Sequence, residues 1–320
     1  DFVGTRPGAP IDSVLREIGD AQQVVAKLAA TLVSAGTATP ANGALDPLLT
    51  LKTDAAHQPE PVERWLSQIA ASVIALRSGD ARLQLATIFN APGGPAEVCP
   101  AVVNGHYPFV ATSADDVSIA DFARLFAPGA ALDGFANTLL GRYVDTSAKT
   151  WHLISADAAS SPISAADVAQ FQRATTIRDT YFADGETRPH FRLDITPVSA
   201  DAATRRVTLD LDGTTIVYTT GSQRATQIMW PTFSLQPTMR LVFDPPTVGG
   251  EALQATGPWA MFRLFGRGRM QPQPATPDHY TLTFQLGARQ AVFDLHVPGG
   301  NNPLAVGLLQ DFHCPSLRAN

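Results

Sequence analysis

The sequence of 320 residues has few cysteines, no long apolar run and no excess of basic charge. It has 23 Lys and Arg residues and 29 Asp and Glu residues, and the net charge of −6 argues against nucleic acid as the main partner. No apolar run approaches the roughly 20 residues needed to span a bilayer. The chain begins at Asp1 without a signal peptide. We therefore expect a soluble fragment or processed product whose targeting segment is missing from this sequence.

Only two cysteines are present, Cys99 and Cys314, and each is followed by proline. The residues alone leave three roles open: idle thiols, metal ligands, or one disulfide, which an oxidising compartment would favour. The metal hypothesis adds His106 and His313, since zinc accepts thiolate and imidazole ligands. Adjacent side chains such as His313 and Cys314 rarely turn toward one ion, and paired ligand spacing is missing. We therefore expect no metal site there.

The sequence also lacks the common catalytic motifs. It contains no G-x-x-x-x-G-K-[ST], no G-x-S-x-G, no H-E-x-x-H and no C-x-x-C. Asp115 and Asp116 are adjacent, so their side chains point apart, and we interpret them as charge at a helix N-terminus. A Ser-His-Asp triad assembled from distant positions stays open. The prediction is a non-enzymatic protein without catalytic residues or cofactors.

Helical periodicity dominates the first 185 residues. Apolar residues recur close to every 3.6 positions in the segments 11–32, 59–78, 118–126, 132–140 and 164–182. Ser118 with Asp121 three positions later resembles a capping box, and Ser164 stands in an equivalent place. These signals predict an N-terminal helical domain over residues 1–185.

The period changes to two near residue 186. RVTLDLDGTTIVYTT predicts a hairpin that turns at Asp212 and Gly213, and HYTLTFQLGARQAVFDLHV predicts another that turns at Gly287. Further short strands with Pro and Gly turns predict an antiparallel β-sandwich-like domain over residues 186–320, ending in a short helix and a tail. The predicted fold class is therefore α+β.

The segment GPWAMFRLFGRGRM allows two interpretations. We favour a strand from Trp259 to Leu264 followed by an exposed basic loop. The alternative is that Arg263 and the arginines after it hold an acidic partner. Trp230, which precedes a proline, is interpreted as a buried aromatic at a strand end. An exposed Trp230 or Trp259 would instead suggest a platform for sugars or peptides.

Six motifs occur in a fixed order along the chain. They are GHYPF (105–109), DVSIADFARLFAPGAALDGF (116–135), QFQRATTIRDTYF (170–182), LDGTTIVYTTG followed by Trp-Pro, GPWAMFRL (257–264) and LLQDFHCPSL (308–317). Together they resemble the C-terminal periplasmic region of the TssM (IcmF-like) inner-membrane proteins of type VI secretion systems. One departure is His106, where the family usually has arginine, so no charge role is carried over to that position.

This resemblance implies a structural role in the periplasm. The full-length protein would be anchored in the inner membrane. This region would bind the outer-membrane lipoprotein TssJ through its β-domain and assemble with further TssM copies and TssL. The candidate contact residues on its loops are Asp212, Gly213, Gln223, Arg224, Gln227, Arg267 and Arg269. The alternatives from other classes are a periplasmic glycan-binding β-sandwich and a hydrolase with an unmarked triad.

The periplasm is oxidising, so the resemblance also favours a disulfide between Cys99 and Cys314 over buried free thiols. Such a bond would return the tail to the helical domain.

Overall fold

The fold is described from a computed structural model. By its backbone contacts the chain divides into two compact units, residues 1–80 and 81–320. The described residues all lie in the second unit and are 83, 85–154, 163–221, 224–246, 252–299 and 301–317. The helices predicted over 11–32 and 59–78 lie outside them. Within the described ranges, no helix is both long and apolar enough to cross a membrane.

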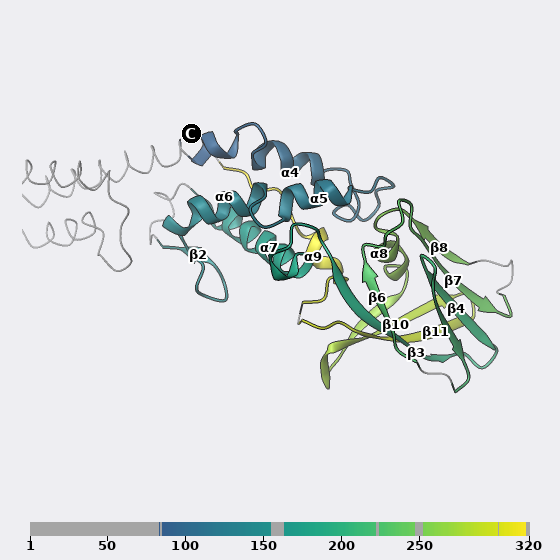
Figure 1. Cartoon of the computed structure of the whole chain (residues 1–320). Helices are drawn as coiled ribbons and strands as arrows, with labels where there is room; N and C mark the ends of the chain where they lie inside the picture. Colours follow the sequence, from purple (N-terminus) through teal and green to yellow (C-terminus); the bar gives the residue numbers. More distant parts are fainter. Residues whose placement is uncertain are drawn as a thin grey trace, which may run out of the picture. The chain divides into compact units, whose positions relative to one another are not determined.

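Helices occupy the first part of this unit (Figure 1). They are α4 (Pro95–Val103), α5 (Ile119–Phe126), α6 (Ala131–Leu139) and α7 (Ala165–Tyr181), with a short ladder of β1 (Val144–Asp145) and β2 (His152–Leu153) between α6 and α7. Both predicted caps are confirmed. The Ser118 hydroxyl accepts the N–H of Asp121 at 3.0 Å, and the Ser164 hydroxyl accepts that of Asp167 at 3.1 Å. Each serine satisfies a backbone donor that the first helical turn leaves free.

Strands follow from residue 191 onward. They are β3 (Phe191–Ala200), β4 (Arg206–Leu211), β5 (Thr214–Thr219), β6 (Thr226–Trp230), β7 (Thr238–Asp244), β8 (Leu253–Thr256), β9 (Arg269–Gln273), β10 (Thr276–Leu286) and β11 (Arg289–His296). Their buried and solvent-facing residues alternate, most regularly in β4, β7 and β11. This alternation gives each sheet one face for the core and one for solvent.

The strands form two antiparallel sheets. One has five strands in the order β6-β3-β11-β10-β9, and the other has four in the order β5-β4-β7-β8. Leucine, phenylalanine and valine side chains from both sheets belong to one buried core. The predicted α+β class, with helices followed by antiparallel sheets, is therefore confirmed.

Both predicted hairpins are present. Leu211 pairs with Thr214 across the first turn, where Asp212 and Gly213 have φ angles of 53° and 91°. Two consecutive positive φ angles match the twist of the flanking strands and explain the Asp-Gly pair. The second hairpin joins β10 to β11 around Gly287, and its register continues to the pair His279–His296.

The strand predicted from Trp259 to Leu264 is wrong. The chain forms a short helix there, α8 (Ala260–Phe265). Nearly every side chain of this segment is buried, among them Met261 and Phe265, because the helix is enclosed by the core. A short run that is apolar all round carries no period, so sequence cannot distinguish a buried helix from a buried strand.

An aromatic cluster joins the helical and β parts of the unit. Phe122 of α5 lies with its ring centroid 5.3 Å from those of both Tyr181 and Trp259. Trp259 lies 4.8 Å from Trp230 and 4.9 Å from Phe262. These edge-on and tilted contacts are the preferred geometries for aromatic pairs. The helices and the sheets therefore share one core.

The C-terminal segment runs back along the helices (Figure 1). After α9 (Val306–Gln310), which confirms the predicted short helix, the N–H of His313 donates to Gln170 Oε1 and that of Ser316 to Asp167 Oδ1, each at 2.9 Å. A disulfide then joins Cys314 to Cys99 of α4, with 5.7 Å between their Cα atoms. The tail is thereby held against α4 and α7.

Candidate docking site

The loop between β6 and β7, residues 231–237, carries two large apolar side chains that lie in solvent. Phe233 is 90% exposed and Leu235 is 99% exposed, the highest values for large apolar side chains among the described residues. Between and beside them lie exposed Ser234 and Gln236. Two fully solvated apolar side chains on one loop have no role in the core, and such side chains are typical of contact with a partner.

The β6–β7 loop is fastened at both of its ends. Trp230, which precedes it, is buried, and its indole N–H donates to the carbonyl of Pro258 at 3.0 Å. At the other end the carbonyl of Pro237 accepts the N–H of Gly257 at 3.0 Å. The exposed side chains therefore stand on a segment whose ends are fixed by the core.

Asp212 supports the same loop from the neighbouring hairpin. Its N–H donates to the carbonyl of Thr238 at 3.0 Å, and its carboxylate faces the N–H of Thr238 at 3.4 Å. Burial tends to raise the pKa of Asp212, but hydrogen bonds from the Ser234 side chain and the backbone N–H of Thr238 hold this pKa below its usual value. The ionised carboxylate thus anchors the loop beside the hairpin tip.

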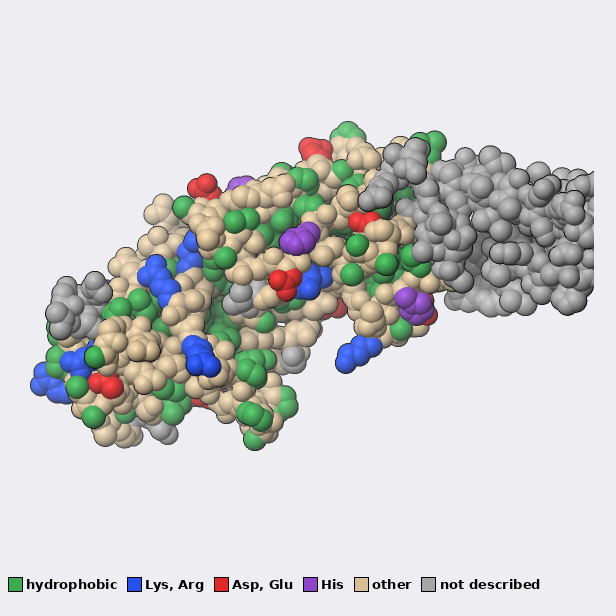
Figure 2. Space-filling view, turned by 180° about the vertical axis from the view of Figure 1, so that it is seen from behind, with side chains coloured by type: hydrophobic (Ala, Val, Ile, Leu, Met, Phe, Trp, Pro, Cys, Tyr) green, Lys and Arg blue, Asp and Glu red, His purple; other side chains and the backbone are tan. Residues whose placement is uncertain are grey.

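The residues predicted to contact a partner lie on three separate segments. Asp212 and Gly213 form the hairpin tip beside the β6–β7 loop. Arg224 and Gln227 are exposed around the start of β6, and Gln223 lies outside the described residues. Arg267 and Arg269 are exposed between α8 and the first residue of β9. On the face drawn in Figure 2, Lys and Arg side chains lie mostly over the β part.

Sequence reasoning missed Phe233 and Leu235. A usable signal was present: two apolar residues stand among Thr, Ser and Gln between two prolines, Pro231 and Pro237. Prolines are typical of turns and strand ends, so a short segment between two of them favours a loop, in which apolar side chains have no sheet face to join.

Trp230 and Trp259 are both buried, with 1% and 0% of their surface exposed. The interpretation of Trp230 as a buried strand-end aromatic is confirmed. A glycan-binding sandwich required at least one of these rings on the surface, so that alternative loses its support. The indole N–H of Trp259 instead donates to the carbonyl of Val117 at 2.8 Å, which ties α8 to the helical part.

Arg263 faces inward, so it does not hold an external acidic partner. Its Nε and Nη2 donate to Asp116 Oδ1 at 3.0 and 2.5 Å, and its Nη1 donates to the carbonyl of Ser113 at 3.0 Å. Asp116 is therefore the ion-pair partner of Arg263. The sequence position of Asp116 had instead suggested a charge at a helix N-terminus. A Cβ at Gly257 would lie 2.5 Å from Asp116 Oδ2, so only glycine permits this approach.

The ring of Tyr107 packs against this ion pair. The Arg263 guanidinium lies 3.9 Å above the centre of its ring, which is a cation–π contact. Burial raises the pKa of Tyr107 to about 12, although the charge of Arg263 lowers it. The group is structural, because each of its charged atoms is satisfied within the chain.

The zinc hypothesis that combined the cysteines with His106 and His313 gains no support. Both sulfur atoms are joined in the disulfide, so neither is a thiolate ligand. His313 is exposed on the tail, where its backbone N–H bonds to Gln170.

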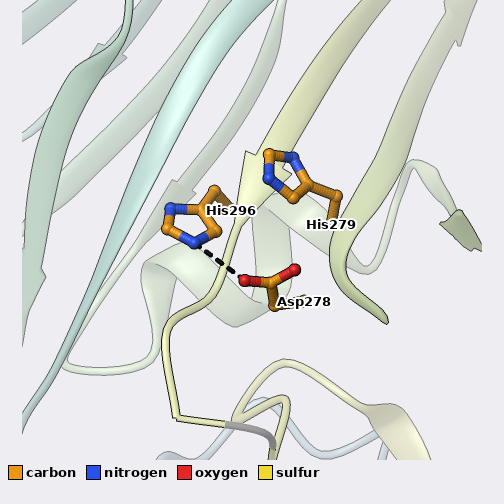
Figure 3. A group of neighbouring side chains, drawn as sticks. All are labelled: Asp278, His279 and His296. Atoms are coloured by element: carbon orange, nitrogen blue, oxygen red, sulfur yellow. Dashed lines mark hydrogen bonds and ion pairs between the residues drawn. The ribbon is translucent and has the colours of Figure 1, made fainter. Parts of the chain in front are cut away.

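A different cluster of histidines and carboxylates lies at one end of the β10–β11 hairpin (Figure 3). One ligand atom from each of Asp278, His279 and His296 lies within 4.8 Å of the others. His296 Nε2 lies 3.0 Å from Asp278 Oδ2, and the two imidazole rings stack with 4.7 Å between their centroids. Sequence reasoning missed this group, although the predicted hairpin register places the two histidines directly opposite each other.

Two further carboxylates face the remaining nitrogens of these histidines. His296 Nδ1 lies 3.3 Å from Asp194 Oδ2, and His279 Nδ1 lies 2.9 Å from Asp294 Oδ2. The bond to Asp194, reinforced by Asp278 and opposed by burial, raises the pKa of His296. The cluster therefore carries three carboxylates around two imidazoles, at 23–45% side-chain exposure.

The described residues do not form the paired nucleophile and base that a hydrolase needs. Their histidine hydrogen bonds go to carboxylates or backbone carbonyls, as for His152 with Thr150 and His190 with Arg188. An open pocket of about 490 Å³ lies between α4 and α6, and among the described residues that line it Arg124 alone is ionisable. It offers neither a nucleophile paired with a base nor a proton donor.

Comparison with known families gives one match within the β part. Residues 193–299 match the family described as type VI secretion protein IcmF C2-like domain. Over 313 residues, which is 98% of this chain, the sequence is 29% identical to the type VI secretion system component TssM1 of Pseudomonas aeruginosa. The chain spans 28% of the length of that relative.

Solved structures share the fold. The C-terminal domain of the type VI secretion protein TssM from EAEC has a TM-score of 0.63 at 19% identity, covering 74% of this chain and 97% of that one. A type VI membrane complex gives a TM-score of 0.66 at 16% identity, covering 98% and 68% of the two chains. These findings confirm the resemblance to the C-terminal region of TssM that the ordered motifs predicted.

Proposed function

From the resemblance of this chain to the C-terminal region of TssM over nearly its whole length, we propose that it is a periplasmic docking module of the type VI secretion membrane core complex. It binds the outer-membrane lipoprotein TssJ, and the full-length protein, anchored in the inner membrane, assembles with further TssM copies and TssL. Its role is structural and non-enzymatic. The TssM1 relative, a type VI secretion system component, and the solved type VI membrane complex named above support this proposal.

The observation that carries the docking site is the exposure of Phe233 and Leu235 on the β6–β7 loop. Burying a large apolar side chain contributes roughly 1.5–3 kcal/mol, and a few such residues dominate most interfaces. The fastened ends of the loop support this role, because a segment that is already held loses less conformational entropy on binding. The hairpin tip, half-buried Asp212 and exposed Gly213, would border the contact.

A direct binding measurement tests the proposal. The purified chain is titrated against the cognate TssJ lipoprotein without its acyl chains, using biolayer interferometry. We expect the double variant Phe233→Ser, Leu235→Ser to bind at least about tenfold more weakly, equivalent to about 1.4 kcal/mol. Ile154→Ser is the matched control, because Ile154 is an apolar side chain 60% exposed in the helical part, and it should bind as the parent does.

The outcomes separate the function from the location of its site. No binding by the folded chain, with or without the other core subunits, would refute the docking function. Unchanged binding by the double variant, together with loss in Arg267→Glu, Arg269→Glu, would retain the function and move the interface to the loop before β9. Thermal unfolding of each variant verifies that the fold is intact.

A further inference from the structure

His279 and His296 lie on the outer face of the five-stranded sheet, and Asp278 precedes His279 in β10 where the register with β9 shifts. Asp194 of β3 is paired directly with His296 of β11, and His296 with His279 of β10, so three neighbouring strands present these side chains in one row. The residues that alternate with them, such as Ile195 and Leu295, are buried in the core. The row is therefore fixed by sheet register, which leaves its members little freedom to separate.

We propose that Asp278, His279 and His296 bind a divalent transition-metal ion, with zinc the best fit. The three side chains offer two imidazole nitrogens and one carboxylate oxygen within 4.8 Å of one another. This is the ligand set of three-ligand zinc sites, which keep a further position for water. Imidazole favours zinc, copper and nickel, whereas calcium and magnesium prefer oxygen ligands alone.

The surrounding carboxylates orient each imidazole for this role. Nδ1 of His296 faces Asp194, and Nδ1 of His279 faces Asp294. Nε2 is therefore the nitrogen of each ring that would bind the ion, and that of His296 already lies against the third ligand, Asp278. Histidines that bind metals commonly hold a carboxylate at the other nitrogen, which fixes the tautomer and raises basicity. Asp294 is itself fixed by Gln273 Nε2 at 2.6 Å.

Charge and access also fit a cation. The ligand Asp278 and the supporting Asp194 and Asp294 place three carboxylates around two imidazoles, which attracts a divalent ion. Figure 3 shows Asp278 directed toward His296 Nε2, and the contact of 3.0 Å between them is the one that an ion would replace. Zinc lies about 2.0–2.2 Å from such nitrogen and oxygen ligands, so small side-chain rotations suffice.

Metal titration tests the site without any other subunit. The untagged chain is treated with a chelator, dialysed, and titrated with zinc chloride by calorimetry, with bound metal counted by mass spectrometry. We expect one equivalent of zinc, a visible absorption band of four-coordinate cobalt when Co²⁺ replaces it, and no response to Ca²⁺ or Mg²⁺. Saturating zinc should raise the Tm by roughly 5 °C, because the ion binds only the folded state.

Variants locate the ion. His279→Asn and His296→Asn should each weaken zinc binding at least tenfold, and Asp294→Asn about tenfold or more through the loss of its support to His279. His152→Asn is the matched control, because His152 faces a carboxylate, Asp145, at 3.7 Å on a different sheet and should bind zinc normally. The Tm of each variant in chelator verifies its fold.

Two results would overturn the proposal. One is the absence of zinc binding by the parent chain at millimolar metal, which would reduce the cluster to an ion-pair ladder. The other is equal affinity in the parent and in the His279→Asn, His296→Asn double variant, which would place the ion elsewhere. The zinc site is independent of lipoprotein docking, and Phe233→Ser, Leu235→Ser should leave zinc affinity unchanged.

Discussion

Trp230 and Phe233 are separated by two residues in the chain and meet opposite surroundings. Trp230 is 1% exposed and lies among the rings that join the helices to the sheets, whereas Phe233 is 90% exposed. Pro231 stands between them, where β6 ends. An aromatic side chain is therefore buried in the core on one side of the proline and exposed to solvent on the other.

The difference follows from what the backbone provides on each side. β6 pairs with β3, and alternation along this pairing turns Ile228 and Trp230 inward. Beyond Trp230 the chain leaves the sheet, and nothing in the register of a strand assigns Phe233 to a face. Its exposure then contributes nothing to folding, which leaves the side chain available to a partner.

The contrast is tested most strongly by truncating both rings. Trp230→Ala should lower the free energy of unfolding by about 3–5 kcal/mol, because it opens a cavity in the aromatic cluster and removes a hydrogen bond to Pro258. Phe233→Ala, the matched control, should change it by less than about 0.5 kcal/mol. Urea unfolding followed by circular dichroism measures both. Equal losses in the two variants would mean that the loop packs against the core.

Removing the disulfide should have the next largest effect. Cys99 and Cys314 are 215 positions apart, and closing so long a loop in the unfolded chain stabilises the fold by up to roughly 5 kcal/mol. We expect Cys99→Ser, Cys314→Ser to lose about 2–5 kcal/mol in urea unfolding. Reducing the parent chain should produce the same loss and leave the variant unaffected. A parent chain that is insensitive to reductant would contradict the bond.

The ion pair between Asp116 and Arg263 should contribute less, because the two side chains are 12% and 21% exposed. Either Asp116→Ala or Arg263→Ala should destabilise by about 2 kcal/mol, since each leaves a partly buried charge unpaired. The double variant should cost less than the sum of the two, and the difference is the coupling between them. Strict additivity in urea unfolding would show that the pair does not act as a unit.

Local signals predicted local structure well. The capping serines, Ser118 and Ser164, and the Asp-Gly turn at Asp212 were correct because each depends on hydrogen bonds or φ angles within a few residues. The helix at Ala260–Phe265 was predicted as a strand because its apolar residues carry no period, and only the surrounding core decides its form.

The candidate sites were harder to predict because they depend on where surfaces meet. The pairing of His279 with His296 follows from the hairpin turn, but Asp194 reaches the same row only through the long-range pairing of β3 with β11. The exposure of Phe233 likewise depends on which segments cover the loop. No local pattern in a single sequence shows which distant segments come together in the folded chain.

The smallest effect concerns the loop at Asp201–Thr204, which differs from the β6–β7 loop because its polar groups hydrogen-bond to one another. Asp201 accepts hydrogen bonds from the Thr204 hydroxyl at 2.6 Å and from the N–H groups of Ala203 and Gln290 at 3.0 Å. The Thr204 bond is the main cause that lowers the pKa of Asp201 to about 2. Asp201→Asn should therefore cost about 1 kcal/mol at pH 7 in urea unfolding.

The pH dependence of this cost has a definite sign. Because the pKa of Asp201 in the folded chain, about 2, lies below its usual value of 3.8, the stabilisation is complete above about pH 4. It is lost as the pH falls from about 4 through 2, and below that range the carboxyl is protonated in both states. The stability difference between the parent and Asp201→Asn should shrink over that interval. Asp311→Asn, which removes a 66% exposed carboxylate, should differ from the parent by less than about 0.5 kcal/mol at pH 7. If the stability difference between the parent and Asp201→Asn stays constant from pH 7 to pH 2, the asparagine acts through packing. The charge on Asp201 would then not stabilise this loop.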